Sequence, residues 1–175
     1  MKYFQLRQGS ELHNILGILW QADYAIPYHV TKQLYDEMER LQVAYYNYND
    51  NLELPDVLEY PTFLVSEMVK KVMKMYDDEI SFKGLQLYPT EYEKKMAPFY
   101  WLPYIEEYNC LHESSRLLPN GTVDELVLEA LQIPDKEIFR VAGIQENRII
   151  VSLPVAESIL RRKPYGVWLE KVRIL

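Results

Sequence analysis

The chain has 175 residues, of which 49% are hydrophobic and 26% charged, which excludes a disordered protein and allows one domain with its own core. Its net charge of −7 is unevenly distributed: residues 1–137 contain 12 Lys and Arg and 23 Asp and Glu, whereas residues 138–175 contain 7 and 3. The acidic excess of residues 1–137 argues against nucleic-acid binding by that part of the chain. One cysteine, Cys110, excludes an intrachain disulfide, and no apolar run approaches the roughly 20 residues of a membrane span.

The first 60 residues are predicted to contain two strands and two helices. Residues 2–6 alternate as an edge strand does. Ser10 is placed to cap a helix whose apolar residues fall at helical spacing: Leu12, Ile15, Leu16 and Leu19. A second helix is predicted by three apolar residues at the same spacing: Leu34, Met38 and Leu41. Residues 45–48 favour a short strand that ends in a polar turn.

A strand–helix–strand pattern occurs twice, near residues 62–88 and 148–172. In the first unit Ser66 is predicted to cap the helix, and in the second Ser152 has the same place. Each helix has a length that suits a parallel crossover between its flanking strands. The recurrence has two interpretations, an internal duplication or the chance repetition of a common unit.

These elements predict the α/β (α+β) class and a single domain over residues 1–175. A mixed β-sheet would be covered by several short helices, with a hairpin formed by residues 138–142 and 148–151. Residues 92–109 are rich in aromatic and acidic side chains, and Pro98 and Pro103 exclude a long helix there, so residues 100–102 favour a strand.

The composition points to a protein-binding surface. Fifteen tyrosines are an excess, and tyrosine suits interfaces because it combines a large area with a polar tip. Two acidic and aromatic stretches are predicted to contact a basic partner through these residues: Tyr45, Tyr48, Asp50, Tyr104, Glu106 and Glu107. The alternatives are that the tyrosines pack in the core and that the acidic surface serves solubility.

Reactive residue types gather in one place only, between Cys110 and Ser115. If this segment is extended, Cys110 and His112 share a face. A cysteine-dependent hydrolase or transferase that uses these two residues is therefore an alternative function. The simpler interpretation is that Cys110 is a buried structural cysteine. The spacing of one cysteine and three histidines does not suit a zinc site, and there is no phosphate-binding glycine loop, so neither metal nor cofactor is predicted.

Four of these segments together resemble a bacterial family of domains of unknown function that is grouped with the immunity proteins of polymorphic-toxin systems. They are the strand that ends in Val151-Ser152, residues 100–102, residues 109–112 and residues 138–141. The resemblance covers roughly residues 61–172; Asn109, His112 and Pro154 depart from the acidic residues expected there. It implies a cytoplasmic protein that binds a cognate toxin and protects its producer.

The sequence supports the same location, because residues 8–11 are polar where a signal peptide needs an apolar core. A third possible function, besides toxin binding and cysteine chemistry, is a structural or oligomerising module.

Overall fold

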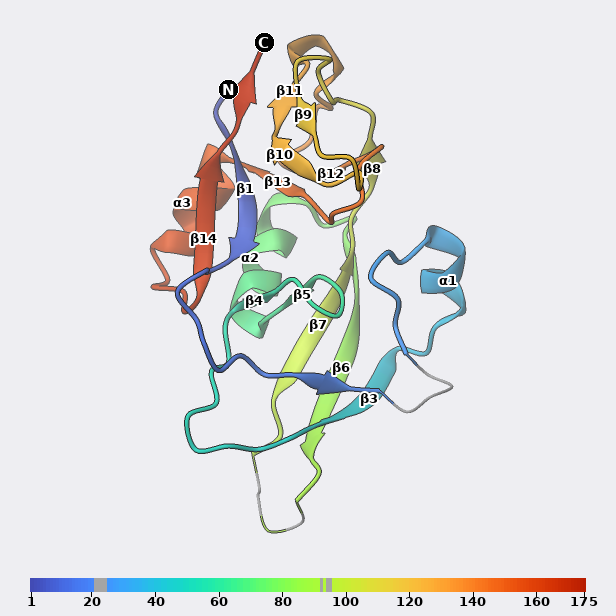
Figure 1. Cartoon of the computed structure of the whole chain (residues 1–175), viewed down its shortest axis with the longest axis vertical. Helices are drawn as coiled ribbons and strands as arrows, with labels where there is room; N and C mark the ends of the chain where they lie inside the picture. The colour runs from blue at the N-terminus through green and yellow to red at the C-terminus, as the bar shows by residue number, and fades with distance from the viewer. Residues whose placement is uncertain (21–24, 92, 94–95) are drawn as a thin grey trace.

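The computed structural model describes residues 1–20, 25–91, 93 and 96–175. Most of its strands belong to two sheets, a five-stranded sheet in the upper part of Figure 1 and a six-stranded sheet in the lower part. The predicted α+β class is confirmed. The prediction of one mixed sheet is wrong, since two larger sheets and two two-stranded sheets are formed.

The six-stranded sheet is built from residues 18–104. In spatial order its strands are β2 (Ile18–Leu19), β3 (Leu41–Tyr46), β6 (Ser81–Pro89), β7 (Phe99–Tyr104), β5 (Leu64–Val65) and β4 (Val57–Leu58). Only β3 and β6 are parallel neighbours; the other pairs are antiparallel. One face of this sheet packs on a core that includes residues of the short helix α1 (Lys32–Glu37), such as Tyr35.

The five-stranded sheet joins the two ends of the chain. In spatial order its strands are β14 (Val167–Lys171), β1 (Tyr3–Gln8), β13 (Ile149–Ser152), β12 (Ile138–Val141) and β8 (Glu107–Tyr108). The predicted hairpin of β12 and β13 is confirmed. The first strand, however, was expected at an edge and lies inside the sheet, between β13 and β14.

The remaining elements are short and lie beside the five-stranded sheet at the top of Figure 1. They are the antiparallel pair β9 (Arg116–Leu117) and β10 (Val123–Glu125), the parallel pair β11 (Val127–Leu128) and β15 (Arg173–Ile174), and a 3-10 helix, Ala130–Gln132.

Both predicted strand–helix–strand units are present, and they share a topology. In the first, β5 is followed by helix α2 (Glu67–Tyr76) and then β6; in the second, β13 is followed by helix α3 (Leu153–Leu160) and then β14. The two strands of each unit run parallel, with an antiparallel strand between them: β7 in the first and β1 in the second. The repeat therefore extends to the arrangement of the strands.

The two units face each other through their helices. α2 and α3 contact each other, and each also contacts the inserted strand of its own sheet. Val69, Val72 and Met73 of α2 are buried in one core cluster with Val155 and Ile159 of α3. This core lies between the two sheets and ties them together by apolar burial.

The helix caps agree with the prediction in one unit and differ in the other. The Ser66 hydroxyl accepts a hydrogen bond from the backbone N–H of Val69 (3.4 Å), so it caps α2 as predicted. Ser152 occupies the N-cap position of α3 but makes no side-chain bond to the helix backbone. Its hydroxyl donates instead to the carboxylate of Glu137.

The helix predicted after Ser10 is wrong. In this segment the backbone groups form hydrogen bonds with Glu53 and not with one another. The Leu16 N–H donates to the Glu53 carbonyl (3.1 Å), and the Glu53 N–H donates to the Asn14 carbonyl (2.8 Å). Leu16 is buried in the core of the six-stranded sheet by this extended segment. The second predicted helix ends at Glu37, before the predicted Leu41, which begins β3.

Candidate partner-binding site

A hollow of about 150 Å³ lies where the two sheets meet. At this place β7 of the six-stranded sheet continues through Ile105 and Glu106 into β8 of the five-stranded sheet. We call it the acidic hollow and define it by Asp77, Glu79, Tyr104, Glu106 and Tyr108, which line it together with Lys32 and Lys136. A shallower depression of about 420 Å³ adjoins it and includes Glu107 and Arg140. The predicted residues Tyr104, Glu106 and Glu107 are therefore together.

Tyr104 is half-buried in this hollow and is held by its neighbours. Its ring lies 5.3 Å from the ring of Tyr35, centroid to centroid. The ammonium group of Lys32 lies over this ring, 5.3 Å from its centroid. A cation near the face of a ring is attracted by its negative quadrupole, so the ring has a fixed orientation before any partner binds.

Glu106 is the carboxylate of the hollow that has no ion-pair partner among the described residues. Its carboxylate accepts a hydrogen bond from the Tyr108 hydroxyl (2.7 Å), and that bond, with burial, raises the pKa of Tyr108. Within the part of the chain that the structure describes, no cation lies within ion-pair distance of Glu106. Among the described residues, the Tyr108 hydroxyl is the one hydrogen-bond partner of this carboxylate.

The other two carboxylates of the hollow share one lysine. Lys136 donates to Glu79 at 2.5 Å and lies 3.6 Å from Asp77. The hydrogen bond to Glu79 raises the pKa of Lys136, and the same bond lowers the pKa of Glu79. One cation faces two carboxylates, so this side of the hollow also keeps an excess of negative charge.

Glu107 has a structural role. Its carboxylate pairs with the guanidinium of Arg140, whose side chain is only 12% exposed. Burial lowers the pKa of Arg140, and the nearby charge of Glu107 opposes this shift. The guanidinium also donates a hydrogen bond to Asn147 (3.3 Å). Removing Glu107 would leave a buried cation without its counter-ion.

The other predicted group, Tyr45, Tyr48 and Asp50, lies elsewhere. Tyr45 is opposite Tyr88 in the β3–β6 register, whereas Tyr104 is opposite Ser81. Seven residues of extended strand separate those positions on β6, which is about 23 Å. The structure therefore does not bring the two acidic and aromatic stretches into one surface. Tyr92, at the start of the second stretch, lies outside the described residues.

Tyr46, between the two predicted tyrosines, is a core residue. It is fully buried, and its hydroxyl donates to the Met96 carbonyl at 2.6 Å. Tyr48 packs at the border of the same core, and Asp50 is exposed.

Cys110 has the environment of a structural cysteine. Its side chain is fully buried, its thiol donates to the Tyr108 carbonyl (3.5 Å), and burial raises its pKa to about 11. His112 is engaged separately: Nδ1 bonds to the Ser114 hydroxyl (2.8 Å) and Nε2 lies 3.6 Å from Glu129. A nucleophilic cysteine needs a lowered pKa and a nearby base, so this geometry does not support cysteine catalysis.

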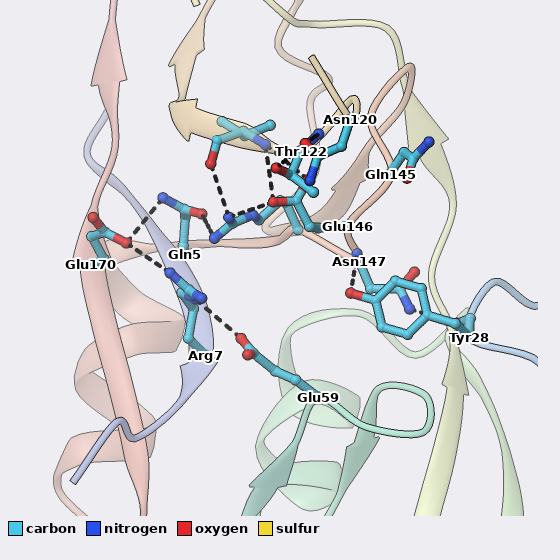
Figure 2. Close-up of polar contacts among 12 residues, drawn as sticks. Gln5, Arg7, Tyr28, Glu59, Asn120, Thr122, Gln145, Glu146, Asn147 and Glu170 are labelled. Carbon is cyan, nitrogen blue, oxygen red and sulfur yellow. Dashed lines mark hydrogen bonds and ion pairs between the residues drawn. The ribbon is translucent and has the colours of Figure 1, made fainter. Parts of the chain in front are cut away.

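Sequence reasoning missed a polar network on the five-stranded sheet, shown in Figure 2. The buried guanidinium of Arg148 donates to Gln5 (3.1 Å), to Glu146 (2.9 Å) and to the Val123 carbonyl (3.4 Å). Glu146 also accepts from the Val123 N–H at 3.0 Å. These bonds fix the β9–β10 hairpin against the sheet.

Two further contacts in Figure 2 connect segments that are distant in sequence. Arg7 donates to Glu59 at 3.1 Å and lies 3.6 Å from Glu170, so it links β14 to the residue that follows β4. Asn147 donates its backbone N–H to the Tyr28 hydroxyl (3.1 Å) and its side chain to the Tyr28 carbonyl (2.7 Å). No local pattern in the sequence could have indicated these pairs.

No family model matches the sequence, and no curated protein matches it either. The resemblance to immunity-associated domains therefore remains a prediction. None of the helices among the described residues has the length and apolar character needed to cross a membrane. In the same residues, no three His, Cys, Asp or Glu side chains come together as metal ligands would.

Proposed function

We propose that this chain is a non-enzymatic binding protein, specifically a cytoplasmic immunity protein that binds a cognate bacterial toxin and neutralises it. The observation that supports the proposal best is the acidic hollow. There the predicted Tyr104 and Glu106 meet two carboxylates from another segment, Asp77 and Glu79. Excess negative charge beside partly exposed tyrosines suits a basic protein partner.

The proposed mechanism is occlusion. A basic active site, such as that of a toxin acting on an anionic substrate, would be attracted to the hollow by its charge and then covered. Tyr104 would contribute contact area without losing much side-chain freedom, because Tyr35 and Lys32 already hold its ring. The carboxylates would take the place of the anionic substrate.

Growth rescue tests the function. The C-terminal region of the protein encoded beside this one is expressed in a bacterial host, with and without this chain. We expect toxicity that this chain relieves, together with a stable purified complex. A toxic neighbour that is not rescued, or a harmless one, would contradict the proposal.

Two matched charge reversals test the site within that complex. Glu106→Lys is expected to slow association at low salt by about tenfold or more and to weaken its salt dependence, because electrostatic steering acts mainly on the association rate. Asp50→Lys makes the same charge change at an exposed position outside the acidic hollow and is expected to have a much smaller effect. Equal effects of both variants would show that net charge, not this hollow, controls binding. Glu107 is left unchanged because it neutralises Arg140.

A further inference from the structure

One face of the six-stranded sheet is only partly covered. Across β2, β3, β6 and β7, the cross-strand register aligns Leu19 with Tyr45 and Tyr88, and Val43 with Gln86 and Phe99. We call this face the open strip and define it by its large apolar residues: Leu19, Leu41, Val43, Tyr45, Tyr88 and Phe99. Residues that alternate with them, such as Ala44 and Tyr46, are fully buried on the opposite face.

The open strip is large and exposed. Leu41 is 53% exposed, Tyr88 46%, Val43 45%, Leu19 41% and Phe99 38%. For side chains of about 200 Å² each, these fractions leave roughly 450 Å² of exposed apolar surface, which is comparable to the largest apolar patch of a typical monomer, and such patches are often functional. Single exposed apolar residues are common, but five on neighbouring strands suit an interface.

The strip contains no charged side chain among its described residues. Its polar member, Gln86, is already engaged, because its amide donates to the carbonyls of Ala97 (3.0 Å) and Pro98 (3.2 Å). The absence of charge and the presence of aromatic rings are the composition of an interface core.

The ring of Phe99 packs over the backbone of Gly84 in β6. A Cβ atom on Gly84 would lie 2.5 Å from the Phe99 ring, so only glycine leaves room for the ring in its present place. Trp101 packs against the same ring edge to face, with centroids 4.9 Å apart. Phe99 is therefore fixed before any partner binds.

Helix α2 marks the boundary of the strip on one side. Lys70 lies 3.1 Å from the centroid of the Trp101 ring, and Trp101 donates its ring N–H to Glu67 at 2.6 Å. Beyond Trp101 the same face of the sheet is buried under α2, as the full burial of Val65 shows. The strip is the part of this face that α2 does not cover.

We propose that the open strip is the contact between two copies of this chain, related by a two-fold axis. Under such symmetry, residues near the axis meet their own counterparts, so a charged strip would repel itself and an uncharged one does not. Two sheet faces also pack on each other, about 10 Å apart, with their side chains interdigitated. Two strips together would bury roughly 900 Å² of apolar surface, and with a polar rim the contact reaches the roughly 1,200 Å² of the smaller stable interfaces.

Sedimentation of the full chain tests the proposal. At concentrations from about 1 to 200 μM, a range that covers the affinity of an interface of this size, we expect the mass to rise from 20.9 kDa to twice that value. A monomer at every concentration would overturn the proposal and assign the strip to a different protein.

Substitutions place any dimer on the strip. Val43→Glu and Tyr88→Glu each put a carboxylate near its own counterpart, so each is expected to weaken dimerisation at least about 100-fold. Both positions are exposed, and a urea unfolding midpoint close to that of the parent chain verifies folding. The matched control is Leu131→Glu, which adds the same charge at an apolar position outside the strip. Leu131 is 94% exposed, and its substitution should leave the dimer intact. A dimer that survives both strip variants would overturn the proposal.

Discussion

Glu53 holds three segments together although it lies at the surface. Its carboxylate accepts the backbone N–H groups of His13 and Asn14, both at 2.8 Å, and the hydroxyl of Tyr165 at 2.7 Å. The hydrogen bond from Asn14, followed by those from Tyr165 and His13, lowers the pKa of Glu53. All three donors favour the ionised carboxylate, so this residue couples folding to pH.

We expect Glu53 to contribute to acid unfolding. Because its pKa is lower in the folded chain than in the unfolded chain, its contribution is complete above the ordinary value of 4.5 and is lost as the pH falls through the lowered value. Urea unfolding between pH 7 and pH 3 should therefore show a shallower loss of stability in Glu53→Gln than in the parent chain. Glu113→Gln, at another exposed position, is the control; an equal change in both variants would contradict this role.

Cys110 is predicted to resist alkylation in the native state. With a pKa of about 11 in place of the ordinary 9.0, the thiolate at pH 8 is about 100-fold scarcer, and burial slows the reaction further. Iodoacetamide should thus react at least about 100-fold more slowly with the folded chain than with the chain in denaturant. Rapid native labelling near neutral pH would instead support cysteine chemistry.

At the scale of the element, the two capping serines show that equal positions in a repeat need not have equal roles. Ser66 bonds to its own helix, whereas Ser152 bonds to Glu137, the residue just before β12. The second serine therefore ties α3 to a strand and leaves the helix N-terminus without a side-chain cap.

Substitution of the two serines should separate these roles. Ser66→Ala is expected to cost about 1 kcal/mol of unfolding free energy, and Ser66→Thr much less, because threonine retains the capping hydroxyl. Ser152→Ala is expected to be coupled to Glu137→Gln in a double-mutant cycle, while Ser66→Ala should be additive with Glu137→Gln. Urea midpoints measure all of these variants. Coupling at Ser66 and none at Ser152 would reverse the assignment.

Local elements were predictable where local chemistry determines them. Helix α2 and strand β6 followed from a cap, an apolar spacing and a return strand. The helix predicted after Ser10 failed because the same apolar spacing also suits an extended segment, once Glu53 supplies its hydrogen bonds. Spacing alone cannot distinguish these outcomes when a distant residue provides the partners.

The candidate site was predictable only in part for the same reason. Tyr104 and Glu106 were found from the composition of one stretch of sequence. Asp77 and Lys136 reach the hollow from other segments, and their contributions depend on the packing of the two sheets. The ion pair of Glu107 with Arg140, which assigns Glu107 a structural role, likewise depends on the pairing of β8 with β12.

At the scale of the whole molecule, β1 connects the two ends of the chain. Phe4 is opposite Val151 on one side and Lys171 on the other. Its place inside the sheet could not be predicted from its short alternating sequence, because both neighbours lie more than a hundred residues away.

Deletion of residues 1–8 should therefore damage the whole five-stranded sheet. The change removes the strand between β13 and β14 and buried Leu6 from the core that contains α2 and α3. We expect loss of the cooperative urea transition, measured by tryptophan fluorescence and circular dichroism together. A deletion variant that unfolds in one transition, with a midpoint near that of the full chain, would contradict this view.

The position of β1 also determines when the protein is able to fold during synthesis. Residues 3–8 leave the ribosome before β13, which begins about 140 residues later, and this interval is roughly ten seconds of translation. The six-stranded sheet, complete by Tyr104, is able to form on the nascent chain. The five-stranded sheet has to wait, and during that interval Tyr3 and Leu6 are accessible to chaperones.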